Sequence, residues 1–137
     1  MCTISAFLTR KANFERLFVT GVVTSPNYPG YYSFDLNKTY VIQVEQGHVL
    51  SIHFTAFDVQ DDSPCIDFLT ITDGNGEELM EASCGDNLPA DLTSTSNVVK
   101  LLFHTDEYYS TRSGWSLNWT AVTPGEKPDC MVLKKMG

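Results

Sequence analysis

Carboxylate side chains crowd two short segments of this chain. Asp58, Asp61 and Asp62 lie close together in the sequence, and Asp106 is followed directly by Glu107. Like charges at this spacing repel one another unless a cation or a basic partner screens them. A solvated acidic surface is the alternative interpretation, because most acidic runs are of that kind. The chemistry available is therefore the binding of a cation or a basic group.

The histidines do not form a catalytic or metal-binding arrangement. His48 follows a turn, His53 lies in an alternating run and His104 ends another one. None has the spacing of a zinc motif, and neither a Gly-x-Ser-x-Gly elbow nor a His-Glu-x-x-His helix is present. Residues 73–77 look like the start of an EF-hand loop but lack its later glycine, its final glutamate and its helices. We therefore predict that the chain is not an enzyme.

The charge balance excludes two classes of partner. The chain has 137 residues, of which 17 are acidic and 9 basic, and its net charge is −8. Such a surface repels phosphate backbones and anionic lipids, so we expect no nucleic acid partner and no direct membrane insertion. No window approaches the roughly 18 consecutive apolar residues that cross a bilayer. Residues 1–6 are too short for a cleavable secretion signal.

Two sequons mark candidate glycosylation sites. They begin at Asn37 and Asn118 and are compatible with passage through a secretory pathway. Around Asn118 the apolar residues alternate strictly with polar ones. We therefore expect Asn118 to face water beside Ser116 and Thr120.

Short alternating runs between turn residues predict an all-β sandwich in a single domain. The runs Tyr40, Ile42, Val44 and Leu50, Ile52 place one face of each strand in a core. Residues 73–76 predict a hairpin turn. Residues 123–129, rich in Pro, Gly and charge, predict a linker. The expected strands are 18–24, 39–45, 48–57, 67–72, 79–82, 98–104 and 114–121.

Several landmarks follow one another along the chain. They are SPNYPGYY at 25–32, CIDFLTITDG at 65–74, CG at 84–85, TSNVVKLLFHTD at 95–106 and GW at 114–115. Their order resembles the CUB domain, an extracellular module of complement and procollagen-processing proteases, endocytic receptors and seminal-plasma adhesins. The resemblance covers residues 14–122, with 1–13 as an N-terminal extension and 123–137 as a linker or the start of another module. It implies an antiparallel, jelly-roll-like β-sandwich.

Four cysteines can pair in three ways, and composition does not choose among them. The resemblance implies a disulfide between Cys65 and Cys84, with two buried free thiols as the alternative. The first disulfide of the family is missing here. Cys2 and Cys130 could pair with each other, pair with neighbouring modules or remain free.

Many CUB domains bind Ca²⁺ at one end of the sandwich, and the resemblance places Asp67 and Asp106 at two of the ligand positions. Gln60 stands where the family has a glutamate, which removes one carboxylate. Tyr32 matches the tyrosine that orients the aspartates. Tyr108 is followed by Tyr109 where the family often has serine and asparagine.

The resulting hypothesis is a non-catalytic, extracellular protein-interaction module of a secreted or cell-surface protein. Asp61 or Asp62 would meet a lysine or arginine of the partner, and Tyr32 and Tyr108 would belong to the binding region. Asp58, Asp61 and Asp62 are also candidates to replace the missing carboxylate. Two alternatives stay open: a calcium-independent module that binds glycans, and an exosite domain of a modular protease.

Overall fold

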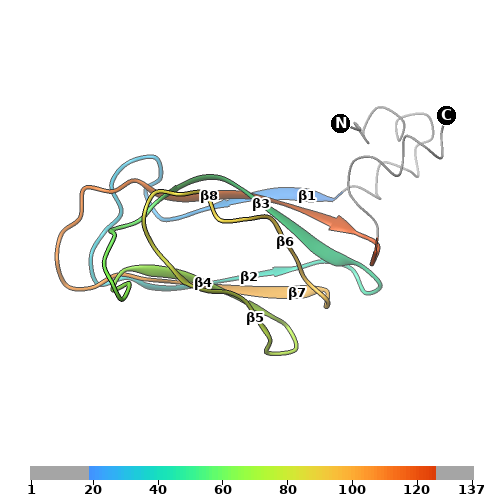
Figure 1. Cartoon of the computed structure of the whole chain (residues 1–137). Helices are drawn as coiled ribbons and strands as arrows, with labels where there is room; N and C mark the ends of the chain where they lie inside the picture. Colours follow the sequence, from blue (N-terminus) through green and yellow to red (C-terminus); the bar gives the residue numbers. More distant parts are fainter. Residues whose placement is uncertain (1–18, 126–137) are drawn as a thin grey trace.

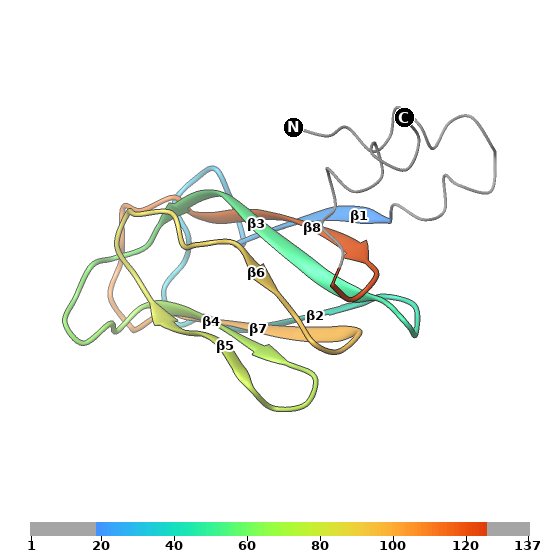
Figure 2. The same ribbon diagram turned by 45° about the vertical axis from the view of Figure 1, so that its right-hand side comes forward.

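The computed structural model describes residues 19–125, which form two antiparallel four-stranded sheets. The first sheet has the order β1-β8-β3-β6 and the second the order β2-β7-β4-β5 (Figures 1 and 2). This confirms the predicted β-sandwich. The strands are β1 (Thr20–Thr24), β2 (Asn37–Gln43), β3 (Val49–Asp58), β4 (Phe68–Asp73), β5 (Glu78–Ser83), β6 (Leu92–Thr93), β7 (Val98–His104) and β8 (Gly114–Val122).

Most strands agree with the predicted runs to within two residues, and β7 agrees at both ends. Strand β6 was not predicted, because a strand of two residues has no alternation to read. The expected exposure of Ser116 is wrong. Its relative exposure is only 7%, since it lies on the central strand β8 between Thr24 and Ala56. Cys2, Cys130 and the predicted extension 1–13 lie outside the described residues, as does most of the segment 123–137.

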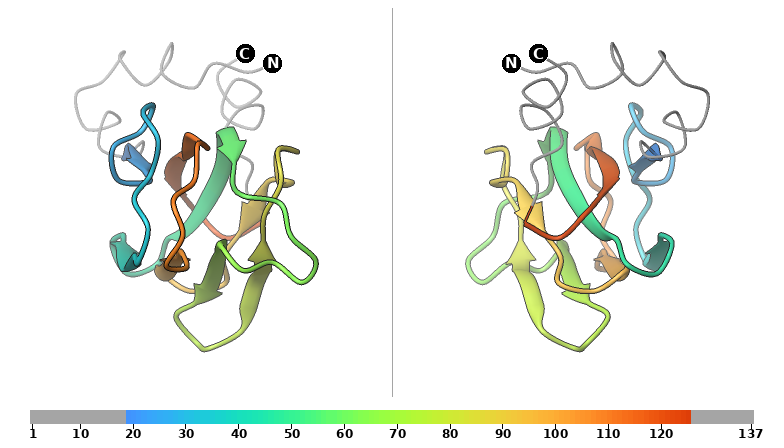
Figure 3. Two further views of the ribbon diagram at one scale, coloured as in Figure 1. Left: turned by 90° about the vertical axis from the view of Figure 1, so that its left-hand side faces the viewer. Right: turned by 90° about the vertical axis from the view of Figure 1, so that its right-hand side faces the viewer.

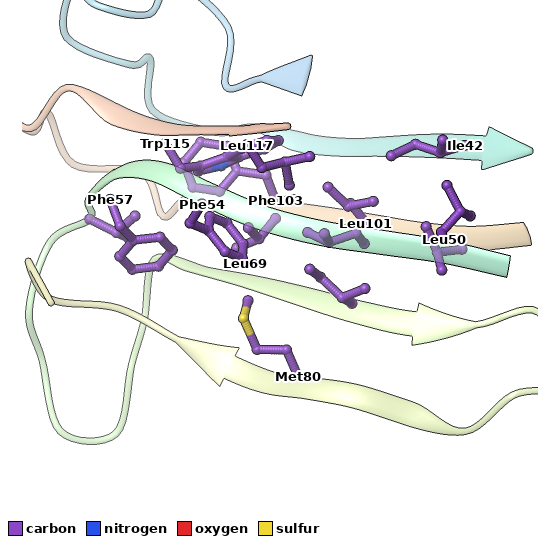
Figure 4. Close-up of a cluster of buried hydrophobic side chains, with 14 of the residues drawn as sticks. Ile42, Leu50, Phe54, Phe57, Leu69, Met80, Leu101, Phe103, Trp115 and Leu117 are labelled. Carbon is purple, nitrogen blue, oxygen red and sulfur yellow. The ribbon is translucent and has the colours of Figure 1, made fainter. Parts of the chain in front are cut away.

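The core lies between the sheets, as Figure 4 shows. Alternate residues of β3 and β7 are buried, and Ile52 and Phe54 of β3 share one core cluster with Leu101 and Phe103 of β7. Phe103 also contacts Trp115 edge to face, with ring centroids 5.9 Å apart. Burial of each such side chain contributes about 1.5–3 kcal/mol, which holds the two sheets together.

Three connecting segments meet at one end of the sandwich, on the left of Figure 1. We call this region the loop end; it comprises residues 25–36, 59–67 and 105–113. Gly114 fixes the first segment against β8. It has a φ of 90°, and a Cβ there would collide with the Ser25 hydroxyl. With glycine at this position, Ser25 Oγ accepts a hydrogen bond of 2.9 Å from the N–H of Trp115.

The predicted disulfide between Cys65 and Cys84 is present, with Cα atoms 5.8 Å apart. It joins the segment before β4 to the end of β5. A backbone bridge between Val59 and Gly85 lies next to it, with N···O distances of 2.9 and 2.8 Å. The middle segment of the loop end is therefore tied to the second sheet.

Candidate functional site

Asp67 is the centre of the loop end. It directly precedes β4, and only 1% of its surface is exposed. Its Oδ2 accepts a hydrogen bond of 2.8 Å from the Tyr32 hydroxyl, and its Oδ1 accepts one of 2.8 Å from the N–H of Asp106. The structure thus brings together three residues that are far apart in the sequence.

Tyr32 orients this carboxylate from below the surface. It is 1% exposed, and its ring contacts Phe103 edge to face with centroids 5.1 Å apart. Its hydroxyl oxygen also accepts the N–H of Gln60 at 3.0 Å, which brings the third predicted ligand position to the same place. Burial raises the pKa of Tyr32 to about 12, so the hydroxyl stays protonated and donates a hydrogen bond to Asp67.

Asp106 links its own segment of the loop end to the other two. Its carbonyl oxygen accepts the N–H of Asp35 at 2.7 Å, and its own N–H binds Asp67. Its Oδ1 accepts the N–H of Tyr108 at 2.9 Å, which closes a tight local turn. Asp106 is therefore held in place by its backbone on both sides, with part of its carboxylate left for other contacts.

Asp58, a candidate to replace the missing carboxylate, is paired with a basic side chain. Its Oδ1 accepts a bond of 2.8 Å from Arg112 Nη1, and its Oδ2 accepts the N–H of Ser113 at 3.2 Å. Burial raises the pKa of Asp58, but the bonds from Arg112 and Ser113 outweigh it and hold that pKa below its usual value. This pair joins the end of β3 to the segment before β8, and sequence reasoning missed it.

Asp61 and Asp62 lie beside Cys84 of the disulfide. Asp61 is exposed, and a Cβ at Gly85 would lie 3.7 Å from its Oδ1, so it sits beside the disulfide. Neither residue takes part in the hydrogen bonds that hold Asp67. Within residues 19–125, no three carboxylate, histidine or cysteine side chains are grouped so that they could hold a metal ion.

Comparison with known proteins decides the family. A family model described as the CUB domain matches residues 16–119, well over half of the chain. The chain belongs to the CUB domain family. CUB domains are non-catalytic interaction modules and are typical of extracellular proteins.

Relatives of this CUB module are much longer proteins. It is 37% identical over 109 residues to human cubilin and 33% identical over 107 residues to human mannan-binding lectin serine protease 1. These matches cover 77% and 75% of this chain but only 3% and 15% of the relatives. Among solved structures, the MASP-1 CUB2 domain bound to Ca²⁺ has 28% identity and a TM-score of 0.66, covering 73% of this chain and 90% of that one.

The other predicted residues of this CUB module are distributed as follows. Tyr108 and Tyr109 are each 69% exposed, in contrast to the buried Asp67 and Tyr32. Asn37 begins β2 and Asn118 lies on β8 opposite Val22 and His53, and both asparagines are exposed. Their glycosylation stays a prediction. No helix within residues 19–125 is long and apolar enough to span a membrane.

A second buried carboxylate, Asp73, was read from the sequence only as part of a turn. It is 2% exposed and accepts the N–H groups of Gly74 and Thr95 at 2.8 and 2.7 Å. The burial of Asp73 could have been predicted from its position in the strand. Leu69, Ile71 and Asp73 share one parity on β4, so the alternation places all three in the core.

Proposed function

We propose that this CUB module binds an extracellular partner protein through its loop end, where carboxylates receive a lysine or arginine side chain of the partner. The observation that carries the proposal is how the Asp67 carboxylate is paired. Its buried carboxylate accepts two hydrogen bonds and forms no ion pair within the described residues. A buried charge of this kind is costly unless a cation approaches it.

Calcium fits the donors present at this site, although the set carries little charge. Asp67 and Asp106 would supply carboxylate oxygens, and Gln60 would supply an amide carbonyl oxygen. A hard cation accepts all of these ligands, and its affinity falls with each carboxylate that is missing. The bound ion would supply positive charge that holds the three loop segments together. A relative whose structure is described as bound to Ca²⁺ supports this reading.

The charge distribution of the module favours a basic partner. The described residues contain only three lysines and arginines, namely Lys38, Lys100 and Arg112. Arg112 is already paired with Asp58, so it does not neutralise Asp67 or Asp106. Asp61 and Asp62 extend the negative surface beside the disulfide. A partner's cationic side chain would be steered towards this end of the module.

Thermal melting in millimolar Ca²⁺, with EDTA and Mg²⁺ as controls, tests the metal. Calcium binds the folded chain and not the unfolded one, so it raises the melting temperature by mass action; a concentration of 100 times Kd stabilises by about 2.7 kcal/mol. Asp106→Ala should abolish the shift, and Gln60→Glu should lower the calcium concentration that it requires.

An unchanged melting curve, together with no heat of binding in calorimetry, would remove calcium from the proposal. A surface contact without metal would then remain.

A second candidate function follows from one of the relatives. The match to mannan-binding lectin serine protease 1 favours a role as an exosite domain of a modular protease. In that case the loop end would recruit a substrate and the chemistry would occur elsewhere in the protein. A protease motif in sequence adjoining this module would support it, and a full-length chain without one would contradict it.

A further inference from the structure

Four aromatic side chains are exposed on two segments of the loop end. Tyr31 and Phe34 are 51% and 49% exposed, and Tyr108 and Tyr109 are each 69% exposed. We call these four residues the aromatic patch. Figure 3 (left) shows the two segments that carry them, 25–36 in blue and 105–113 in orange, running side by side. Exposed large aromatic side chains are characteristic of binding regions.

Backbone hydrogen bonds hold the two segments of the patch in register. The N–H of Thr105 donates to the Leu36 carbonyl at 3.0 Å, and the N–H of Asp35 donates to the Asp106 carbonyl at 2.7 Å. The N–H of Tyr32 donates to the Arg112 carbonyl at 3.1 Å. The aromatic patch is therefore built on ordered backbone, which lowers the entropy lost when a partner binds.

Of the charged side chains on the two segments that carry the aromatic patch, all but Arg112 are negative. Asp35, Asp106 and Glu107 adjoin it in the sequence. The basic side chains of the described residues are engaged or placed elsewhere. Arg112 pairs with Asp58. The Nζ of Lys38 lies 5.7 Å from the centroid of the Tyr40 ring. Lys100 lies on β7, next to the edge strand β2. Aromatic faces beside carboxylates, where Arg112 is already paired with Asp58, suit a cationic ligand.

We propose that the aromatic patch binds an arginine-bearing segment of the partner protein, independently of calcium. A guanidinium is planar and weakly hydrated, so it stacks on the exposed rings of Tyr108 and Tyr109 while Asp106 or Glu107 accepts its N–H groups. Tyr31 and Phe34 pack against the aliphatic part of the same segment. This inference rests on the proposed function, because it places the partner at the same loop end, and adds arginine as the preferred residue.

The test is a nuclear magnetic resonance titration of the ¹⁵N-labelled 137-residue chain in EDTA. The probe is a capped hexapeptide of alternating glycine and arginine, compared with peptides in which lysine or citrulline replaces arginine. Saturable shifts are expected at the backbone amides of Tyr31, Phe34 and residues 106–109. Tyr108→Ser combined with Tyr109→Asn should weaken binding about tenfold, because two cation–π contacts are lost. Val41→Ser, which changes an exposed residue of β2, is the matched control.

Several results would overturn the proposal. They are no binding of the arginine peptide, equal binding of the citrulline or lysine peptide, and unchanged binding by the double tyrosine variant in a chain whose melting shows that it is folded. Displacement of the peptide by a neutral oligosaccharide, with shifts at the same amides, would assign the aromatic patch to glycans instead.

The two proposals can fail separately. Peptide binding in EDTA reports on the aromatic patch alone, whereas the calcium-dependent change in melting temperature reports on Asp67 and Asp106.

Discussion

Asp67 and Asp73 bracket strand β4, and both carboxylates are buried, with 1% and 2% of each residue's surface exposed. Around Asp73, the N–H groups of Gly74, Thr95 and Ser96 and the hydroxyls of Thr95 and Ser96 all lie within hydrogen-bond distance. Among residues 19–125, only the Tyr32 hydroxyl and one N–H donate to Asp67. The same residue type thus closes a structural network at one end of the strand and keeps acceptor capacity at the other.

The pKa of Asp73 indicates that this residue stabilises the fold. Burial raises that pKa, but the hydrogen bonds from Ser96, Thr95 and Gly74 outweigh burial, and the pKa is held below its usual value. A carboxylate whose folded pKa is depressed contributes stability above its unfolded pKa of about 3.9, and this stability is lost as the pH falls through the folded pKa. Residues of this kind hold a fold together, whereas an incompletely paired carboxylate is available to a ligand.

The largest effect is expected from Asp73→Ala. It leaves several buried N–H groups and hydroxyls without an acceptor, and we expect the free energy of unfolding to fall by about 3 kcal/mol or more. Urea denaturation measures it. Asp91→Ala is the control, because Asp91 is exposed and its ion pair with His53 contributes less than about 1 kcal/mol. Equal losses in the two variants would refute the structural role of Asp73.

Removal of the Cys65–Cys84 disulfide should come next. The double change to alanine opens a loop of about 20 residues, which costs about 3 kcal/mol on the chain-entropy account. Because the disulfide lies at the Asp67 end, hydrogen exchange should accelerate at the amide of Asp106 more than at that of Thr95.

Two measurements check the disulfide prediction. A non-reducing peptide map must first show that Cys65 is bonded to Cys84. Equal acceleration of exchange at the amides of Asp106 and Thr95 would mean that the disulfide does not act locally.

A smaller effect is expected from Tyr32→Phe. The hydroxyl donates to Asp67 and accepts the N–H of Gln60, so its removal should cost about 1–2 kcal/mol. Tyr31→Phe, at a half-exposed ring, is the control. The raised pKa of Tyr32, about 12, contributes stability that is present below pH 10 and lost as the pH rises through 12. The Tyr32→Phe variant should therefore not lose this part of its stability as the pH rises. An alkaline melting profile identical to that of the unchanged chain would contradict this expectation.

The smallest effect is expected from Arg112→Ala. The side chains of Arg112 and Asp58 are each about one-third exposed, so solvent screens the pair and its loss should cost less than about 1 kcal/mol. The cost should shrink in high salt. It should also shrink at low pH, because the depressed pKa of Asp58 makes this stability present above about pH 4 and lost as the pH falls. Lys100→Ala is the control, and an effect of several kcal/mol would mean that the pair is far better shielded than its exposure indicates.

The sandwich was predictable because alternation is a local property of the chain. Val98–His104 shows it most clearly, with Val99, Leu101 and Phe103 all buried and Lys100 exposed. Two-residue β6 has no such pattern and was missed. The Cys65–Cys84 pairing was predictable only from the order of the family's landmarks.

The site was less predictable, because its contacts join residues far apart in the sequence. Tyr32 and Asp67 are 35 positions apart, and Arg112 and Asp58 are 54 apart. The family resemblance placed the first pair. No pattern in the sequence near Asp58 predicts its pairing with Arg112. The roles of Asp67, Asp106 and Gln60 as ligands stay a prediction.

The pairing of β1 with β8 has a mechanical consequence. Thr20 lies opposite Thr120, and the Val19 carbonyl accepts the N–H of Ala121 at 2.8 Å, at the pole of the sandwich away from the loop end (Figure 1). Tension applied between Val19 and Val122 would peel these antiparallel strands apart one pair at a time, from that pole inward. Single-molecule pulling should therefore show unzipping at low force, and one abrupt high-force rupture would contradict it. The loop end would be the last part of the module to feel the load.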